Sequence, residues 1–314
     1  MADNHFRALG KCPSAKVTAI ASRTKAHAVA RAKEWGIRVA ESPEDLVASD
    51  DVDVVFVLTN TETHYEYATM AMQNGKHVLV EKPVSYDEKE ICGLQETATK
   101  ESVLCVPGHS YLYLPEIARM QRNAKAGFPG EPFYFYMSET YRMPDDYVGK
   151  YHGPVREVLC HEFYVMLALL GVPDQISAFG STFRGALADS WEQVVVNARF
   201  SGGALAQVFL SWVGVDQTSD PWTFKLKVLG RTGGEHFSRR DVVLHDRLGT
   251  GISSPLYDEM FECQDRYFIE QCVLSDEKPL SSLTDAFRAL RLMLATEESI
   301  RTGACVHTRE IHRP

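Results

Sequence analysis

Short apolar segments alternate with longer segments of helical periodicity through the first third of the chain. Strands that alternate with helices of about ten to fifteen residues are typical of crossover units, which build a parallel sheet. We therefore predict an α/β domain with a parallel sheet over residues 1–107. The segments that we expect to be buried strands are residues 16–21, 53–58, 77–80 and 103–106.

The pattern changes after residue 108, where longer segments of alternating apolar and polar residues begin. Gly202 and Gly203 separate two of these segments and can supply the positive φ angles of a hairpin turn. We predict an α+β domain over residues 108–314, with an open antiparallel sheet and amphipathic helices near residues 257–274 and 283–302. The expected strands are residues 133–141, 175–183, 193–200, 204–212 and 223–229.

Composition narrows the classes of partner and of compartment. The 314 residues are 45% hydrophobic and 24% charged, as in an ordinary globular protein, and carry a net charge of −9. An acidic chain without a basic patch is not expected to bind nucleic acid. No apolar segment approaches the roughly 20 residues of a membrane span, and there is no signal peptide. The seven scattered cysteines form no Cys-x-x-Cys pair, so we predict a cytoplasmic protein with reduced thiols.

The segment His77-Val78-Leu79-Val80-Glu81-Lys82-Pro83 places a lysine directly after an apolar strand. The residue before a proline favours extended geometry, so Lys82 is expected at the carboxyl end of the strand. Ligands of open parallel sheets bind outside these ends. A lysine there can orient a hydroxyl or carbonyl group and stabilise a developing alkoxide. The simpler alternative is a surface Glu-Lys pair.

A longer block around this lysine favours the first reading. It consists of the strand at 53–58, the loop Thr59-Asn60-Thr61 up to His64, the helix end Ala71 to Val78, and Glu81-Lys82-Pro83. This block closely resembles the Gfo/Idh/MocA family of NAD(P)-dependent oxidoreductases. The loop departs from the family pattern at Asn60 and Thr61. The resemblance implies a Rossmann-type first domain and cofactor contacts from Thr59, Asn60, His64, Glu81 and Lys82.

The start of the chain matches only the end of the family's glycine-rich motif. His5-Phe6-Arg7-Ala8-Leu9 corresponds to the helix of that motif, which places Ala2 at its third glycine position and Met1 inside the first helix. The first two glycines, which let the backbone approach pyrophosphate, and the central strand are missing. Either the protein begins about ten residues earlier, as the family pattern implies, or the chain has lost its phosphate cradle.

The strand at 16–21 is followed by Ser22-Arg23-Thr24-Lys25. An acid at this place binds the free 2′-hydroxyl of NAD, whereas a basic residue accommodates the 2′-phosphate of NADP. Ser22, Arg23 and Lys25 are therefore predicted cofactor contacts that favour NADP(H) over NAD(H). A basic helix start on a solvated turn is the alternative.

A second chemical cluster precedes the apolar helical segment that ends at Gly171. Glu157, His161 and Tyr164 have the spacing i, i+4 and i+7, which predicts one face of a helix. In the family this region carries an acid/base histidine, and His161 matches it, while Glu157 and Tyr164 replace two aspartates. Histidine suits proton exchange with a hydroxyl group; a buried structural histidine is the alternative. We expect no metal site here.

These observations predict an oxidoreductase that transfers hydride between nicotinamide and a carbinol or carbonyl carbon of a sugar, polyol or related cyclic alcohol. Its catalytic residues would be Lys82, His161, Glu157 and Tyr164. The alternative is a non-catalytic ligand sensor or regulator on the same fold. We expect a homodimer or homotetramer that associates through the open sheet. Weaker candidates for the substrate side are Tyr111, Tyr141, Arg142, Asp145 and His152.

Overall fold

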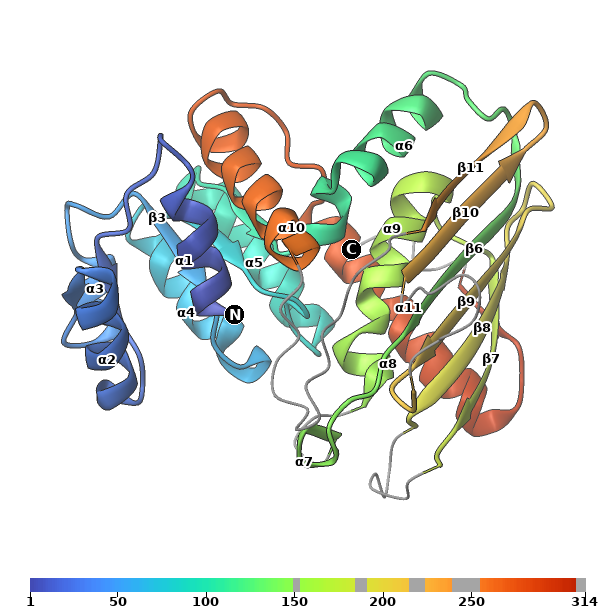
Figure 1. Ribbon diagram of the computed structural model, residues 1–314, viewed down its shortest axis with the longest axis horizontal. Helices are drawn as coiled ribbons and strands as arrows, with labels where there is room; N and C mark the ends of the chain where they lie inside the picture. Colours follow the sequence, from blue (N-terminus) through green and yellow to red (C-terminus); the bar gives the residue numbers. More distant parts are fainter. Residues whose placement is uncertain (149–152, 184–190, 215–223, 239–254, 309–314) are drawn as a thin grey trace. The chain divides into compact units, whose positions relative to one another are not determined.

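A computed structural model describes residues 1–148, 153–183, 191–214, 224–238 and 255–308. The chain forms two compact units (Figure 1). The first contains Met1–Tyr113 and Asp258–Ala286, and the second contains Leu114–Tyr257 and Phe287–Pro314.

The first unit alternates helices and strands, as the hydrophobic pattern predicts. Local signals define several helix ends. The Ser42 hydroxyl accepts a hydrogen bond from the Asp45 amide at 3.1 Å, and Gly36 ends a helix with a φ of 68°. The elements are α1 (Ala2–Gly10), β1 (Ala19–Ile20), α2 (Lys25–Trp35), β2 (Arg38–Val39), α3 (Pro43–Val47), β3 (Val54–Val57), α4 (His64–Gln73), β4 (His77–Val80), α5 (Glu88–Glu101) and β5 (Cys105–Pro107).

The C-terminal part of the chain returns to this unit. Helix α10 (Pro255–Arg266), from Asp258 on, and the π-helical segment Tyr267–Val273 belong to it, and α10 lies beside α1 (Figure 1). Phe268 and Ile269 pack against Leu79 of β4 and Val106 of β5 in one buried core. The predicted domain boundary lies after residue 107. The compact units divide after Tyr113 instead, and the first unit also includes residues 258–286.

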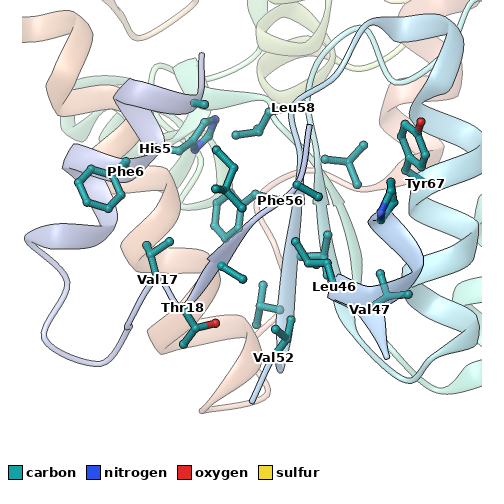
Figure 2. A pocket seen from close by; sticks show the side chains of 18 of the residues that line it. His5, Phe6, Val17, Thr18, Leu46, Val47, Val52, Phe56, Leu58 and Tyr67 are labelled. Atoms are coloured by element: carbon teal, nitrogen blue, oxygen red, sulfur yellow. The ribbon is translucent and has the colours of Figure 1, made fainter. Parts of the chain in front are cut away.

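The parallel strands of the first unit form two separate sheets. Within the described part of the chain, β1 pairs only with β2, and β3, β4 and β5 form a second sheet in that order. A cavity of about 1460 Å³ is lined by residues of both sheets. Figure 2 shows Val17 and Thr18, next to β1, and Phe56 and Leu58, from β3 and its end, around this cavity.

The second unit contains one seven-stranded sheet. Its helices α8 (Pro154–Glu157), α9 (Leu159–Leu170) and α11 (Leu283–Thr302) lie on one face of the sheet (Figure 1). The other elements are α6 (Pro115–Lys125), β6 (Pro132–Thr140), α7 (Asp145–Val148), β7 (Gln175–Ser181), β8 (Gln193–Arg199), β9 (Leu205–Ser211), β10 (Phe224–Gly230), β11 (Gly233–Ser238) and β12 (Val306–His307).

The prediction of a purely antiparallel sheet is wrong at one position. The strand order is β11-β10-β6-β9-β8-β7-β12, and β6 pairs with β9 in parallel, with Met137 opposite Val208. Parallel neighbours need a long connection, and the helices between β6 and β7 provide one. The other pairs are antiparallel, including the β8–β9 hairpin, where Gly203 has a φ of 87°.

The gap between β1 and β3 generates a prediction for stability. An N-terminal extension that supplies an apolar strand of about six residues should pair with both sheet edges and fill only the part of the cavity that lies between β1 and β3. The melting temperature should rise by about 5 °C or more, since several backbone groups would gain partners. Thermal melts of the 314-residue chain and the extended variant measure the change. A Gly/Ser extension of the same length is the control, and equal melting temperatures for all three proteins would contradict the prediction.

Candidate functional site

Lys82 lies two residues beyond β4, the middle strand of the three-stranded sheet. This strand is held from both sides, because Val80 lies opposite Val57 of β3 and Pro107 of β5. The backbone amide of Lys82 donates a hydrogen bond to Glu81 Oε2 at 3.0 Å. The predicted position of Lys82 at the carboxyl end of a parallel strand is therefore confirmed, and ligands of such sheets bind at this edge.

Glu81 belongs to a buried group of three ionisable side chains. His5 of α1 lies between two carboxylates, with Nε2 3.1 Å from Glu81 Oε1 and Nδ1 2.9 Å from Asp265 Oδ2. Burial lowers the pKa of His5, but Asp265 and Glu81 outweigh burial and raise this pKa to about 9. Burial raises the pKa of Glu81, yet His5 and Lys82 bring it below its usual value. His5 and Glu81 are therefore both charged at neutral pH.

His64 connects the loops that follow β3 and β4. Its Nε2 lies 3.0 Å from the Thr59 carbonyl oxygen, and its Nδ1 lies 3.0 Å from the Pro83 carbonyl oxygen. The side chain is buried. His64 thus fixes the backbone on both sides of the strand ends, and a direct contact with cofactor stays a prediction.

The end of β5 approaches Glu81 closely. A Cβ atom on Gly108 would lie 3.3 Å from Glu81 Cα, which leaves room for glycine but hardly for a side chain. The next residue, His109, is buried, and its Nδ1 lies 2.6 Å from Ser281 Oγ. Burial lowers the pKa of His109 to about 3, so its ring is neutral at physiological pH. The close approach of Gly108 to Glu81 limits the movement of the Glu81 carboxylate.

The cavity of the first unit brings together five of the predicted cofactor contacts. They come from the start of α1, from the end of β1 and from the loop after β3, and they are Ala2, Ser22, Arg23, Thr59 and Asn60. Lys25 does not line the cavity, and its ammonium group lies 2.8 Å from Glu41 Oε2. The structure thus assembles this predicted set with the exception of Lys25, His64, Glu81 and Lys82.

The side chains around this cavity fit a dinucleotide in part. Helix α1 begins at the cavity, and the first turn of a helix favours an anion. Arg23, another residue that lines the cavity, is exposed and can bind a phosphate. The helix start, Arg23 and the Thr59-Asn60 loop are the parts of this cavity that would hold a dinucleotide.

The other predicted catalytic residues lie in the second unit. His161 and Tyr164 are buried on α9, and His161 Nδ1 lies 2.6 Å from the Tyr164 hydroxyl oxygen. Glu157 lies on the short helix α8, because Val158, with φ and ψ of −124° and −40°, interrupts the helix. The prediction that all three residues share one continuous helix is wrong for Glu157. Their catalytic roles stay predictions.

The weaker substrate-side candidates belong to both units. The Tyr141 hydroxyl accepts a hydrogen bond from Trp212 Nε1 at 2.9 Å, and Arg142 lies 3.8 Å from Asp145 on the surface. Tyr111 lies in the 3-10 turn Ser110–Tyr113 of the first unit. His152 lies outside the described residues.

Sequence reasoning missed Asp265 and the role of His5. His5 served only to align the start of the chain with a motif. Asp265 is spaced four residues after Phe261 and three before Phe268, both buried, so an acid lies on the apolar face of a predicted amphipathic helix. An acid at such a position needs a buried partner, and this was the available signal.

A metal site and a membrane-spanning helix are two further features that the described residues could contain. Within these ranges, His, Cys, Asp and Glu side chains form no cluster of three that could hold a metal ion. The helices of the described chain also include none that is long and apolar enough to cross a membrane.

Comparison with known proteins extends the likeness over both units. The scyllo-inositol 2-dehydrogenase (NAD(+)) of Bacillus subtilis strain 168 is 23% identical over 307 residues, 93% of this chain and 88% of that protein. The D-xylose 1-dehydrogenase (NADP(+)) 2 of Haloferax volcanii is 25% identical over 93% of this chain and 91% of that protein. The structure of Lactobacillus casei scyllo-inositol dehydrogenase with NAD(H) and scyllo-inositol has a TM-score of 0.84 at 17% identity, covering 97% of this chain and 95% of that chain.

Two family descriptions match consecutive parts of the chain. Residues 1–109 match the oxidoreductase family with an NAD-binding Rossmann fold, and residues 117–234 match the GFO/IDH/MocA C-terminal domain. Together the matches span well over half of the sequence and include the Lys82 strand, the His161 helix and five strands of the large sheet. The chain therefore belongs to the Gfo/Idh/MocA family of oxidoreductases.

Proposed function

We propose that the protein is an NAD(P)-dependent dehydrogenase that acts on a CH–OH group of a cyclic polyol or sugar. The observation that carries the proposal is Lys82, held at the end of the central strand β4 by two parallel neighbours and by Glu81. The named relatives support the substrate class, because they act on inositol or xylose.

The chain's own residues would contribute binding and proton transfer. A bound nicotinamide dinucleotide supplies the hydride chemistry. The Lys82 ammonium group would orient the reacting oxygen and stabilise the charge that develops on it. His161 would accept the hydroxyl proton in oxidation and return it in reduction, while Tyr164 fixes the orientation of the imidazole ring through its 2.6 Å contact.

Removal of either group should abolish most of the activity. Lys82→Met and His161→Asn should each lower kcat/KM for inositol oxidation by about 100-fold or more, because each removes an electrostatic or proton-transfer contribution. Absorbance of the reduced cofactor at a series of inositol concentrations gives kcat/KM.

The exposed Lys89 of α5 provides the matched control, since Lys89→Met makes the same substitution at a lysine outside the proposed site. Circular dichroism should show that all three variants are folded. Parental rates in folded Lys82→Met and His161→Asn would refute the proposed roles.

We propose that NADP(H) is preferred over NAD(H). The two relatives named above differ in cofactor, so the choice depends on local residues. The segment after β1 carries no acid that would repel a 2′-phosphate, and Arg23 lines the cavity there.

Arg23→Ala should therefore weaken NADPH binding about 10-fold and leave NADH binding nearly unchanged, since a charge-assisted hydrogen bond contributes about 1.5–3 kcal/mol. Calorimetric titration of both cofactors measures the difference. Lys25→Ala, which removes a lysine already paired with Glu41, is the control. Equal losses for NADPH and NADH in Arg23→Ala would contradict the preference.

We propose that the large sheet mediates a homodimer or homotetramer. Phe179 of β7, Val195 of β8 and Phe209 of β9 are cross-strand partners in one row. Their strand neighbours Ala178, Val194 and Val208 are buried, so the row faces away from the helices. Phe179 is 71% exposed in the single chain. Val195 and Phe209 are half-buried, and an apolar row that reaches solvent in this way is typical of an interface.

Sedimentation at micromolar concentration should therefore show a species larger than the 35.2 kDa chain. Phe179→Asp should shift the distribution towards the single chain by placing a charge in the apolar row. Val29→Asp on the exposed face of α2 introduces the same charge elsewhere and should leave the distribution unchanged. A single 35.2 kDa species for the parent protein would contradict the proposal.

We also propose that the protein is cytoplasmic. All seven cysteines are free thiols in the structure, which supports a reducing environment such as the cytoplasm.

A further inference from the structure

A chain of ionisable groups crosses the interior of the first unit. Asp265 of α10, His5 of α1 and Glu81 after β4 are 0%, 1% and 5% exposed. Both carboxylate oxygens of Asp265 lie within 3.0 Å of His5 Nδ1, and Glu81 Oε1 lies 3.1 Å from Nε2. Three segments that are far apart in the sequence thus meet at a single imidazole ring.

The charge states define which atoms donate. Burial raises the pKa of Asp265, against the lowering effect of His5, and the pKa of His5 itself is raised to about 9. Ionised carboxylates only accept hydrogen bonds, so a ring that donates to two of them carries a proton on each nitrogen. Phe56 and Phe261 contact the ring edge-on, with centroids 5.3 Å and 4.9 Å away, and limit its rotation. His5 is therefore a fixed imidazolium with one N–H directed at each acid.

Glu81 connects this cation to the proposed catalytic lysine. One of its oxygens accepts from His5, and the other accepts from the backbone amide of Lys82. Gly108 leaves little space on the other side of the Glu81 backbone. Displacement of the carboxylate would therefore change the backbone at the start of the Lys82 loop.

We propose that His5 and Asp265 are positioning residues for Lys82, which act by fixing the Glu81 carboxylate that holds the Lys82 backbone. This inference rests on the proposed function, since it assigns a role relative to Lys82. A displacement of about 1 Å in a reacting group can cost about 100-fold in rate. The three groups should therefore matter for kcat more than for cofactor binding.

The charge state sets the pH range of this arrangement. The charged or titratable groups that face His5 and Glu81 are Asp265, Lys82 and His109, and burial keeps His109 neutral. The pKa of His5 is raised from 6.5 to about 9. Its contribution to stability is thus complete below about pH 6.5 and is lost as the pH rises through about 9. The melting-temperature difference between the parent and His5→Gln should narrow over this range.

The variants His5→Gln and Asp265→Asn test the role in catalysis. Each should lower kcat by about 10- to 100-fold while the KM for the cofactor changes by less than about 3-fold. Arg7→Gln is the matched control, because it removes an exposed α1 cation paired with Asp258 of α10. Combination with Lys82→Met separates positioning from general damage. His5→Gln should cost nothing further in the Lys82→Met background, since both act on one group.

Two measurements do not depend on turnover. Nitrogen-15 NMR of the parent should show one histidine, absent in His5→Gln, with both ring nitrogens protonated at pH 7.5 and a titration near pH 9. The ε-carbon signal of Lys82, identified by its loss in Lys82→Met, should move in His5→Gln and stay in Arg7→Gln.

The outcomes separate this inference from the proposed function. Activity that requires Lys82 but is unchanged in His5→Gln and Asp265→Asn overturns the positioning role alone, as does a neutral His5 ring at pH 7.5. Additive losses with Lys82→Met also overturn it. Should no polyol be oxidised, the proposed function fails, and the Lys82 signal decides the inference: a shift in His5→Gln supports it, and an unchanged signal overturns it.

Discussion

The position of the Glu81 carboxylate is the constraint on which the candidate site depends. A carboxylate that is almost fully removed from water requires a cation or several donors, since an isolated buried charge costs far more than a domain's net stability. His5 and the Lys82 amide supply these partners. His5 in turn carries its charge because Asp265 lies on its other side. Loss of one member leaves uncompensated charge, at a cost of about 3–5 kcal/mol.

This network also gives a reason for the path of the chain. Residues 258–286 follow the strands of the second unit in the sequence, but they pack with the first unit. Phe268 and Ile269 bury apolar surface against β4 and β5, and Asp265 places an acid next to His5. The exposed pair between Arg7 and Asp258 lies along the same two helices and contributes little in comparison. Hydrophobic burial holds the returning segment, and the buried acid specifies its register.

The sequence was sufficient for features that depend on local patterns. The Lys82 strand and strands β6 to β10 of the second unit have strong periodicity and lie close to their predicted places, whereas β11 and β12 were not predicted. Features that depend on tertiary contacts were missed. The parallel pairing of β6 with β9 depends on the order of the strands in the sheet, and no sequence pattern within Pro132–Thr140 predicts it. The helix is also interrupted at Val158, where the backbone angles change within an apolar segment whose sequence shows no break. The Asp265 contact joins residues 260 positions apart.

Helix α1 links the two chemical regions of the first unit. Its N-terminus lines the cavity that collects Ser22, Arg23 and Asn60, and one turn later its His5 side chain holds Glu81 next to Lys82. The cavity lies between two sheets whose facing edges are not joined within the described residues, and α1 is held there by α10, by Glu81 and by α2, where Phe6 stacks on Trp35. An anion at the helix start would act on the same rigid element that carries His5. The proposed cofactor cavity and the proposed catalytic lysine are therefore connected through one helix and one buried cation.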